Sequence, residues 1–195
     1  MSIPLEFADQ IAADVIAQLE PHCEPGRCVV AGSVRRRKPQ VGDVEIVCVP
    51  RMVSALQAFG DSQGLLMLDG FGKEALQRDP GFAAVVNQES WERVKGDDKY
   101  ICRILHCSQG WLGDGMPFDV QLDIFCVSAF SWGYQLAIRT GSAEFSQHLA
   151  LAWVLAGFKG IDGNLTRDSV PVPVPDEQTL FRLCGLDYVP PEGRG

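Results

Sequence analysis

The sequence lacks three features that would each indicate a class of protein at once. No apolar stretch in its 195 residues approaches the roughly 20 residues that span a bilayer. The first 20 residues contain no Lys or Arg, so they lack the basic start of a secretory signal peptide. No internal repeat or low-complexity linker occurs. We therefore expect neither a membrane-spanning nor a secreted nor a repetitive protein.

Positive charge is also scarce. There are 17 Lys and Arg against 25 Asp and Glu, and the formal net charge is -8. This balance argues against a protein that coats nucleic acid through bulk positive charge, although it allows a small basic patch on an acidic body. The hydrophobic content of 46% is that of a globular chain, which excludes a disordered one.

The seven cysteines lack the paired spacing of a zinc site. No CxxC occurs, and the two Cys/His groupings, at residues 22–28 and 102–107, are better explained by buried thiols. An odd number of cysteines without a signal peptide indicates reduced thiols. We therefore expect a cytoplasmic protein.

Local patterns predict an α+β fold. Residues 3–20 carry an apolar stripe at helical spacing. Strands are predicted at residues 27–31, 43–49, 99–107 and 118–127, where apolar residues run together or alternate with polar ones.

The last third of the chain changes character. Helices are predicted at residues 129–138, 142–157 and 177–184, with two short strands around the turn at Asp162-Gly163. A weak strand signal also occurs at residues 82–86. We predict two domains, a sheet-bearing one over residues 1–127 and a smaller C-terminal one over residues 128–195.

Three acids stand on predicted sheet faces. Asp43 and Glu45 are two residues apart on one strand, so their side chains point the same way, and Asp123 lies on the polar face of another strand. If these strands are neighbours, the carboxylates converge and raise one another's pKa unless a cation lies between them. Such oxygen ligands suit Mg²⁺. On the pattern alone, a solvated strand face is the commoner explanation.

The segment before these acids favours the metal interpretation. Gly32-Ser33 follows a predicted strand and precedes a predicted helix start, where backbone amides can approach a phosphate. Four consecutive cations follow at residues 35–38. A solvated basic turn would explain the cations alone, whereas a phosphate cradle beside a metal site explains both features.

These segments, in this order, resemble the family X DNA polymerases, the polymerase beta-like nucleotidyltransferases. GSVRR at 32–36 and GDVE at 42–45 match the family's Gly-Ser-x-Arg-Arg and Gly-Asp-x-Asp signature at the same spacing. LDIF at 122–125 matches the strand that bears the third catalytic Asp, and TGS at 140–142 resembles the turn beside the incoming nucleotide. The tail from residue 177 to 191 resembles the end of the last subdomain.

The resemblance implies a fold and an activity. The fold would be a nucleotidyltransferase palm, with a mixed or antiparallel sheet and flanking helices, followed by a small C-terminal α/β subdomain. This layout is similar to the reduced viral members, which lack the lyase domain. The activity would be that of a DNA-directed DNA polymerase that adds dNMP to a primer 3′-hydroxyl, a natural task in short-gap repair.

The resemblance also implies site residues and partners. The catalytic and metal-binding residues would be Asp43, Glu45 and Asp123. Nucleotide-binding residues would be Gly32, Ser33, Arg36, Gly42, Thr140 and Gly141. The carboxylates would hold two Mg²⁺ ions, or Mn²⁺ in their place. The partners would be a dNTP and primer-template or gapped DNA, with no membrane, and the protein would be a monomer.

The sequence departs from the family pattern at several positions. Glu45 replaces the usual second Asp, Gln121 stands where an Arg is common, and Ile138 and Arg139 replace an aromatic pair that often screens the ribose 2′-hydroxyl. Two alternatives therefore stay open. One is nucleotidyl transfer to a small molecule, a protein or an RNA end, and the other is a non-catalytic nucleotide- or DNA-binding module.

Overall fold

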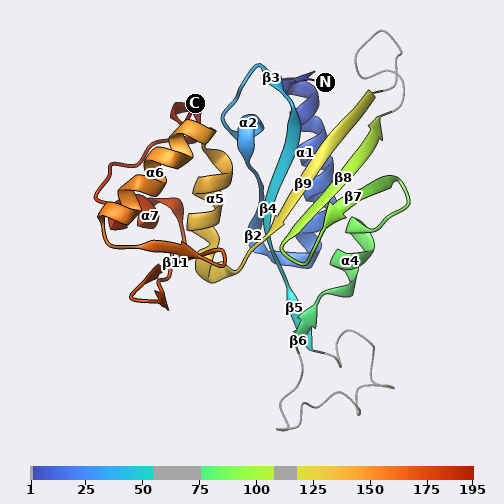
Figure 1. Cartoon of the computed structure of the whole chain (residues 1–195). Helices are drawn as coiled ribbons and strands as arrows, with labels where there is room; N and C mark the ends of the chain where they lie inside the picture. Colours follow the sequence, from blue (N-terminus) through green and yellow to red (C-terminus); the bar gives the residue numbers. More distant parts are fainter. Residues whose placement is uncertain (1, 55–75, 108–117) are drawn as a thin grey trace.

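The computed structural model describes residues 2–54, 76–107 and 118–195 (Figure 1). Its centre is a five-stranded sheet in the order β2-β4-β9-β8-β7. In that order, the strands are Cys23–Val30, Asp43–Pro50, Phe118–Cys126, Tyr100–Cys107 and Trp91–Gly96. β4 and β9 run parallel, and the other neighbours are antiparallel. The predicted α+β class with a mixed sheet is therefore confirmed.

One face of this sheet is covered by helices. α1 (Leu5–Leu19) buries an apolar stripe of five residues against it: Ala8, Ile11, Ala12, Val15 and Leu19. From the sheet, Ile46 and Leu122 belong to the same core. Because strand side chains alternate between faces, the acids of β4 and β9 project from the opposite face.

The segment at residues 82–86 is a helix, so the weak strand prediction there is wrong. α4 (Pro80–Val86) begins with Asp79, whose Oδ1 accepts a hydrogen bond from the Gly81 amide, and with Pro80 at the first helical position. Phe82 and Val86, one helical turn apart, are both buried in the core beneath α1. The N-cap and this burial outweigh the β propensity of the valines.

The remaining elements of the sheet-bearing part are short. α2 (Gly32–Arg35) leads from β2 toward β4. β1 (Ile3–Pro4) pairs with β3 (Gln40–Val41), and β5 (Met52–Ser54) pairs with β6 (Leu76–Arg78), both antiparallel. None of the described helices is long and apolar enough to cross a membrane.

The C-terminal residues form a second group of helices with a small sheet, drawn beside the main sheet in Figure 1. The helices are α5 (Trp132–Thr140), α6 (Ala143–Leu155) and α7 (Glu177–Leu183), and the strands are β10 (Lys159–Ile161), β11 (Asn164–Arg167) and β12 (Val170–Pro171). These elements bury their own apolar cluster, which includes Leu149, Trp153, Phe158, Leu165, Leu180 and Phe181. The domain boundary at residue 127 stays a prediction.

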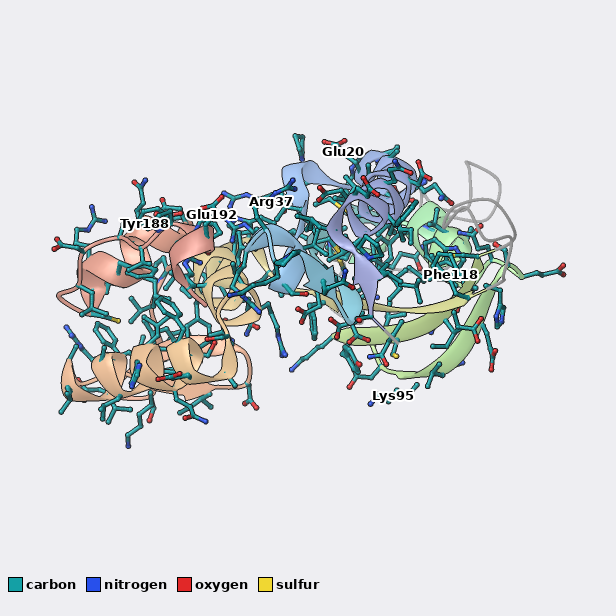
Figure 2. The ribbon with its side chains drawn as sticks, turned by 90° about the horizontal axis from the view of Figure 1, so that it is seen from above. Glu20, Arg37, Lys95, Phe118, Tyr188 and Glu192 are labelled. Carbon is teal, nitrogen blue, oxygen red and sulfur yellow. The ribbon has the colours of Figure 1, made fainter. Side chains whose placement is uncertain are left out.

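An Arg-Glu-Arg cluster joins the two parts, which lie side by side in the view from above (Figure 2). Arg35 of α2 donates two hydrogen bonds to the Glu177 carboxylate on α7, at 2.8 and 2.7 Å. Arg194, whose side chain is fully buried, donates to the same carboxylate. Arg35 also donates to Thr140 Oγ1 at 2.6 Å. The segment that follows Gly32-Ser33 is thereby anchored to the C-terminal helices.

Glu177 stays ionised within this cluster. Burial alone would raise its pKa, but the hydrogen bonds from Arg35 and Arg194 outweigh burial and hold the pKa below the ordinary value. The carboxylate therefore compensates two buried or half-buried guanidinium charges.

Candidate active site

The parallel pairing of β4 and β9 brings the three predicted acids together. Glu45 lies directly opposite Asp123 in the register, and Asp43 lies opposite Gln121. Residues two apart on a strand share a face, so Asp43, Glu45 and Asp123 project on the same side of the sheet. The two strands that carry the acids are therefore neighbours, as convergence of the carboxylates requires.

The pKa values of Asp43 and Glu45 reflect their burial first and this convergence second. Burial raises the pKa of Glu45 to about 7, with further contributions from Asp43 and Asp123. Burial and the charge of Asp123 also raise the pKa of Asp43. Arg36 lowers both values, and Arg139 lowers that of Glu45, so both cations lie within electrostatic reach. The site thus concentrates negative charge that a cation would stabilise.

Two neutral side chains hold Asp123 in place. The Tyr100 hydroxyl donates to Oδ1 and the Gln121 amide donates to Oδ2, each at 2.9 Å. Tyr100 is not among the site residues predicted from the sequence, and Gln121 stands out there only because it replaces the usual Arg. Cys102 lies opposite Asp123 in the β8–β9 register, and alternation places Tyr100 on the same face. The alternation of side chains along residues 99–103 (KYICR) is the one feature of the sequence that could have indicated Tyr100.

The donor set suits a hard divalent cation, although the side chains are not gathered as ligands. Within the described ranges, no group of three or more His, Cys, Asp or Glu side chains is positioned to hold a metal. Glu45 Oε2 lies against Gly32, and both Asp123 oxygens accept from neutral donors. Three neighbouring carboxylates nevertheless supply the oxygen ligands that Mg²⁺ prefers.

The glycine-serine turn lies against these acids. Gly32 is buried with φ of +58°, a conformation that favours glycine, and a Cβ there would overlap the Glu45 carboxylate. Ser33 Oγ is buried and has no hydrogen-bond partner in the described part of the chain. A buried hydroxyl without a partner costs free energy unless something else supplies one. A phosphate oxygen could supply it.

The other predicted nucleotide-binding residues lie around this turn and differ in their burial and in their hydrogen-bond partners. Arg36 donates from Nη1 to the Thr140 carbonyl at 2.5 Å, so it links the turn to the end of α5. Thr140 is fully buried and its hydroxyl accepts from Arg35, whereas Gly141 is half-buried beside Phe145. Gly42 is exposed immediately before Asp43.

A cavity of about 630 Å³ lies between the sheet and the C-terminal elements, and its link to the acids is Tyr100, which lines it and donates to Asp123. Tyr100, Phe125 and Arg139 are among its lining residues. The Arg139 guanidinium lies over the Phe125 ring, 3.9 Å from its centroid, and its Nε is buried without a partner in the described residues. This volume falls in the range of small-molecule sites. From the sequence, Arg139 stands out only because it occupies a position where the family X polymerases often have an aromatic residue.

Gly32→Ala tests whether activity depends on where the Glu45 carboxylate lies, and a control variant shows the effect of backbone strain alone. The new Cβ would displace that carboxylate, and a misplacement of 1 Å can cost about a hundredfold in rate. The matched control is Gly26→Ala, because Gly26 has φ of +68° and open space around its Cβ position. Both variants should lose about 1–2 kcal/mol in urea unfolding, the cost of a left-handed non-glycine residue. Any activity that depends on these carboxylates should therefore fall in Gly32→Ala and not in Gly26→Ala, and equal activity of the two variants would contradict the role of Gly32.

No protein-family model matches the chain, and no curated protein matches it.

Proposed function

We propose that the protein is a Mg²⁺-dependent nucleotidyltransferase of the polymerase beta-like type, and specifically a DNA polymerase acting on short gaps. The observation that carries the proposal is the register of β4 and β9, in which Glu45 opposes Asp123 with Asp43 on the same face. The collinear motifs between about residues 28 and 194 support a palm followed by a nucleotide-selecting C-terminal subdomain.

Asp43, Glu45 and Asp123 are the residues that would hold the two Mg²⁺ ions. Such ions, when bound, neutralise triphosphate charge and favour ionisation of an attacking hydroxyl. The protein's own part is to keep three carboxylates on one rigid sheet face. Tyr100 and Gln121 fix the orientation of Asp123, beside which the primer 3′-hydroxyl would lie.

The turn at Gly32-Ser33 would bind the phosphates of the nucleotide, and the cavity would bind its sugar and base. Ser33 Oγ would donate to a phosphate oxygen, because it is buried without a partner among the described residues. Arg36 adds positive charge next to Asp43 and Glu45 while its bond to Thr140 holds the turn in place. The cavity lined by Phe125 and Arg139 would receive the sugar and base. Catalysis would come mainly from alignment and charge stabilisation, as in phosphoryl transfer generally.

A primer-extension panel tests this proposal. Gapped DNA, open primer-template, single-stranded DNA and RNA ends are each incubated with dNTPs or NTPs, with Mg²⁺ or Mn²⁺, and with EDTA as the control. We expect dNMP addition to gapped DNA that EDTA stops. The assay should be run at low salt, because a chain of charge -8 holds DNA weakly and binding falls steeply with ionic strength.

The panel also distinguishes the alternatives. Extension of single-stranded DNA alone would indicate a terminal transferase, and extension of RNA ends alone would indicate a different acceptor. Failure to extend any nucleic acid would contradict the polymerase proposal. Saturable dNTP binding without extension would instead support a non-catalytic binding module.

A further inference from the structure

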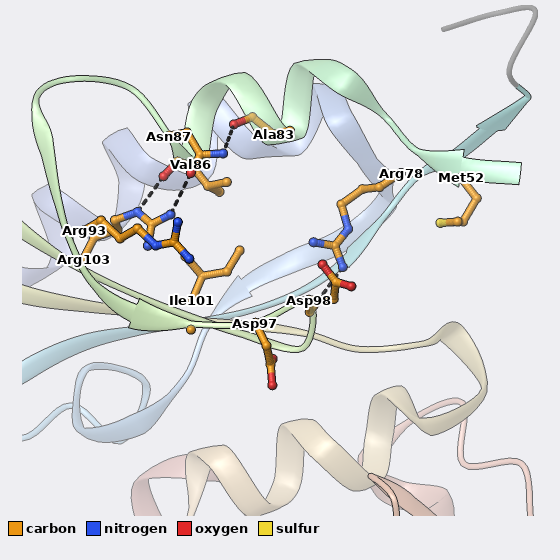
Figure 3. Close-up of a pocket in the computed structure, with 11 residues that line it drawn as sticks. Met52, Arg78, Ala83, Val86, Asn87, Arg93, Asp97, Asp98, Ile101 and Arg103 are labelled. Carbon is orange, nitrogen blue, oxygen red and sulfur yellow. Dashed lines mark hydrogen bonds between the residues drawn. The ribbon is translucent and has the colours of Figure 1, made fainter.

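A second cavity, of about 570 Å³, lies between α4 and the β7–β8 hairpin (Figure 3). It opens on the helix-covered side of the sheet. Ile101 and Arg103 line it, and they alternate along β8 with Tyr100 and Cys102, which face Asp123. The cavity is therefore separated from the candidate active site by the sheet itself.

One lining residue is a buried arginine without an acidic partner. Arg103 is only 4% exposed, and no described carboxylate forms an ion pair with it. Its guanidinium donates to the Val86 carbonyl at 2.7 Å, the Cys102 carbonyl at 3.0 Å and Asn87 Oδ1 at 3.0 Å. A guanidinium carries five N–H donors, so these bonds leave donors to spare. A buried charge without a counter-ion is costly.

A second arginine lies directly opposite the first. Arg93 of β7 and Arg103 of β8 are cross-strand neighbours in the antiparallel register. Burial lowers the pKa of Arg103, and the charge of Arg93 lowers it further. Like charges at opposed positions of a sheet destabilise it. Arg93 is exposed and also has no ion-pair partner among the described residues.

The far end of the cavity adds one more cation and two acids. Figure 3 shows Arg93 and Arg103 together at one end and Arg78 at the other. Arg78 donates to the Asp98 carbonyl and lies over the Phe82 ring, with no ion pair to a described carboxylate. Asp97 also lines the cavity, but its Oδ1 accepts from the backbone amides of its own turn. The Asp98 carboxylate lies at the Arg78 end, away from the arginine pair.

We propose that this cavity binds a phosphate-type oxyanion between Arg93 and Arg103. An anion there would compensate both charges and use their spare N–H donors, since guanidinium forks match phosphate oxygens well. The volume exceeds that of the free ion and accommodates a phosphomonoester. Inorganic phosphate and a deoxynucleoside monophosphate are therefore the two probes that distinguish a free ion from an ester.

The test compares Arg93→Gln with Arg182→Gln. Both variants lose one positive charge, and Arg182 lies on α7, where its guanidinium donates to Thr179 Oγ1, far from the cavity. Each protein is titrated with either probe at constant ionic strength, followed by the arginine Nε–Hε signals in NMR and by thermal unfolding. We expect saturable shifts at Arg93 and Arg103 with a dissociation constant of about 1–10 mM, weakened at least about tenfold by Arg93→Gln alone.

A chloride-only measurement separates binding from a structural role. Without phosphate, Arg93→Gln should unfold at the same temperature as the wild type or higher, because it removes a like-charge pair. Phosphate should then raise the unfolding temperature of the wild type and of Arg182→Gln more than that of Arg93→Gln. Equal increments in all three proteins with both probes, or shifts that saturate with neither probe, would overturn the proposal. Binding of the phosphomonoester but not inorganic phosphate would support it and identify the ester as the ligand.

Discussion

Replacing Asp123 by alanine is expected to abolish nucleotide incorporation while the protein keeps its fold. The change removes one of three converging carboxylates, the one fixed between Tyr100 and Gln121. Loss of a single electrostatic partner in an active site costs about 10²–10³ in rate, and loss of a metal ligand should cost at least the upper figure. The measurement is single-turnover dNMP incorporation on gapped DNA at saturating Mg²⁺.

Two further variants make this result interpretable. Asp119→Ala removes the same residue type from the same strand, but Asp119 is an exposed partner of His106 and should leave incorporation unchanged. Asp123→Asn keeps a hydrogen-bond acceptor for Tyr100 and should be as inactive as the alanine variant, because an amide is a poor ligand for Mg²⁺. Unfolding free energies should stay within about 1 kcal/mol of wild type. Full activity of either Asp123 variant would refute the site.

Glu177→Gln is expected to destabilise the protein by about 3–5 kcal/mol, the cost of removing one partner from a buried ion cluster. The amide cannot compensate Arg194, which is fully buried, or accept the two bonds from Arg35 as a carboxylate does. Urea unfolding measures this loss. Glu144→Gln is the matched control, because Glu144 is exposed on the first turn of α6. A loss below about 1 kcal/mol, typical of surface pairs, would contradict the role of Glu177.

The same glutamate should contribute to the pH dependence of stability. Its folded pKa lies below the ordinary value of 4.5, so its contribution is present above that value. The contribution is lost as the pH falls through the folded pKa and the carboxylate is protonated. Below about pH 4.5, the wild type should therefore lose stability more steeply than Glu177→Gln, which has nothing to protonate there. Parallel curves for the two proteins would contradict this assignment.

Local patterns in the sequence predict the strands that carry the acids, but not which strands are neighbours. Asp43, Glu45 and Asp123 follow the two-residue alternation that a half-polar strand requires, and this alternation is visible without a structure. Their convergence depends on the parallel pairing of β4 with β9, which are far apart in the chain. Only the order of motifs in the family resemblance indicated that pairing in advance.

The supporting residues were beyond local prediction for a different reason. Tyr100 contacts Asp123 because β8 pairs with β9 in one particular register. Arg35 and Glu177 are 142 residues apart in the sequence, and no local pattern around either residue predicts their contact. Likewise, the valines at 85 and 86 favour a strand locally, whereas burial of Phe82 and Val86 under α1 selects a helix. Tertiary packing decides each of these contacts.

The anchoring of Arg35 and Arg36 restricts how this chain can recombine with others. Both residues belong to the same short segment as Gly32-Ser33, yet their side chains are held by Glu177 and Thr140 in the C-terminal elements. A chimera that exchanged everything after residue 127 would leave both guanidinium groups without acceptors unless the donor lobe supplied equivalents at the same places. We therefore expect substitutions in the two parts to be correlated in evolution, so that Arg35 and Arg36 change together with their acceptors Glu177 and Thr140.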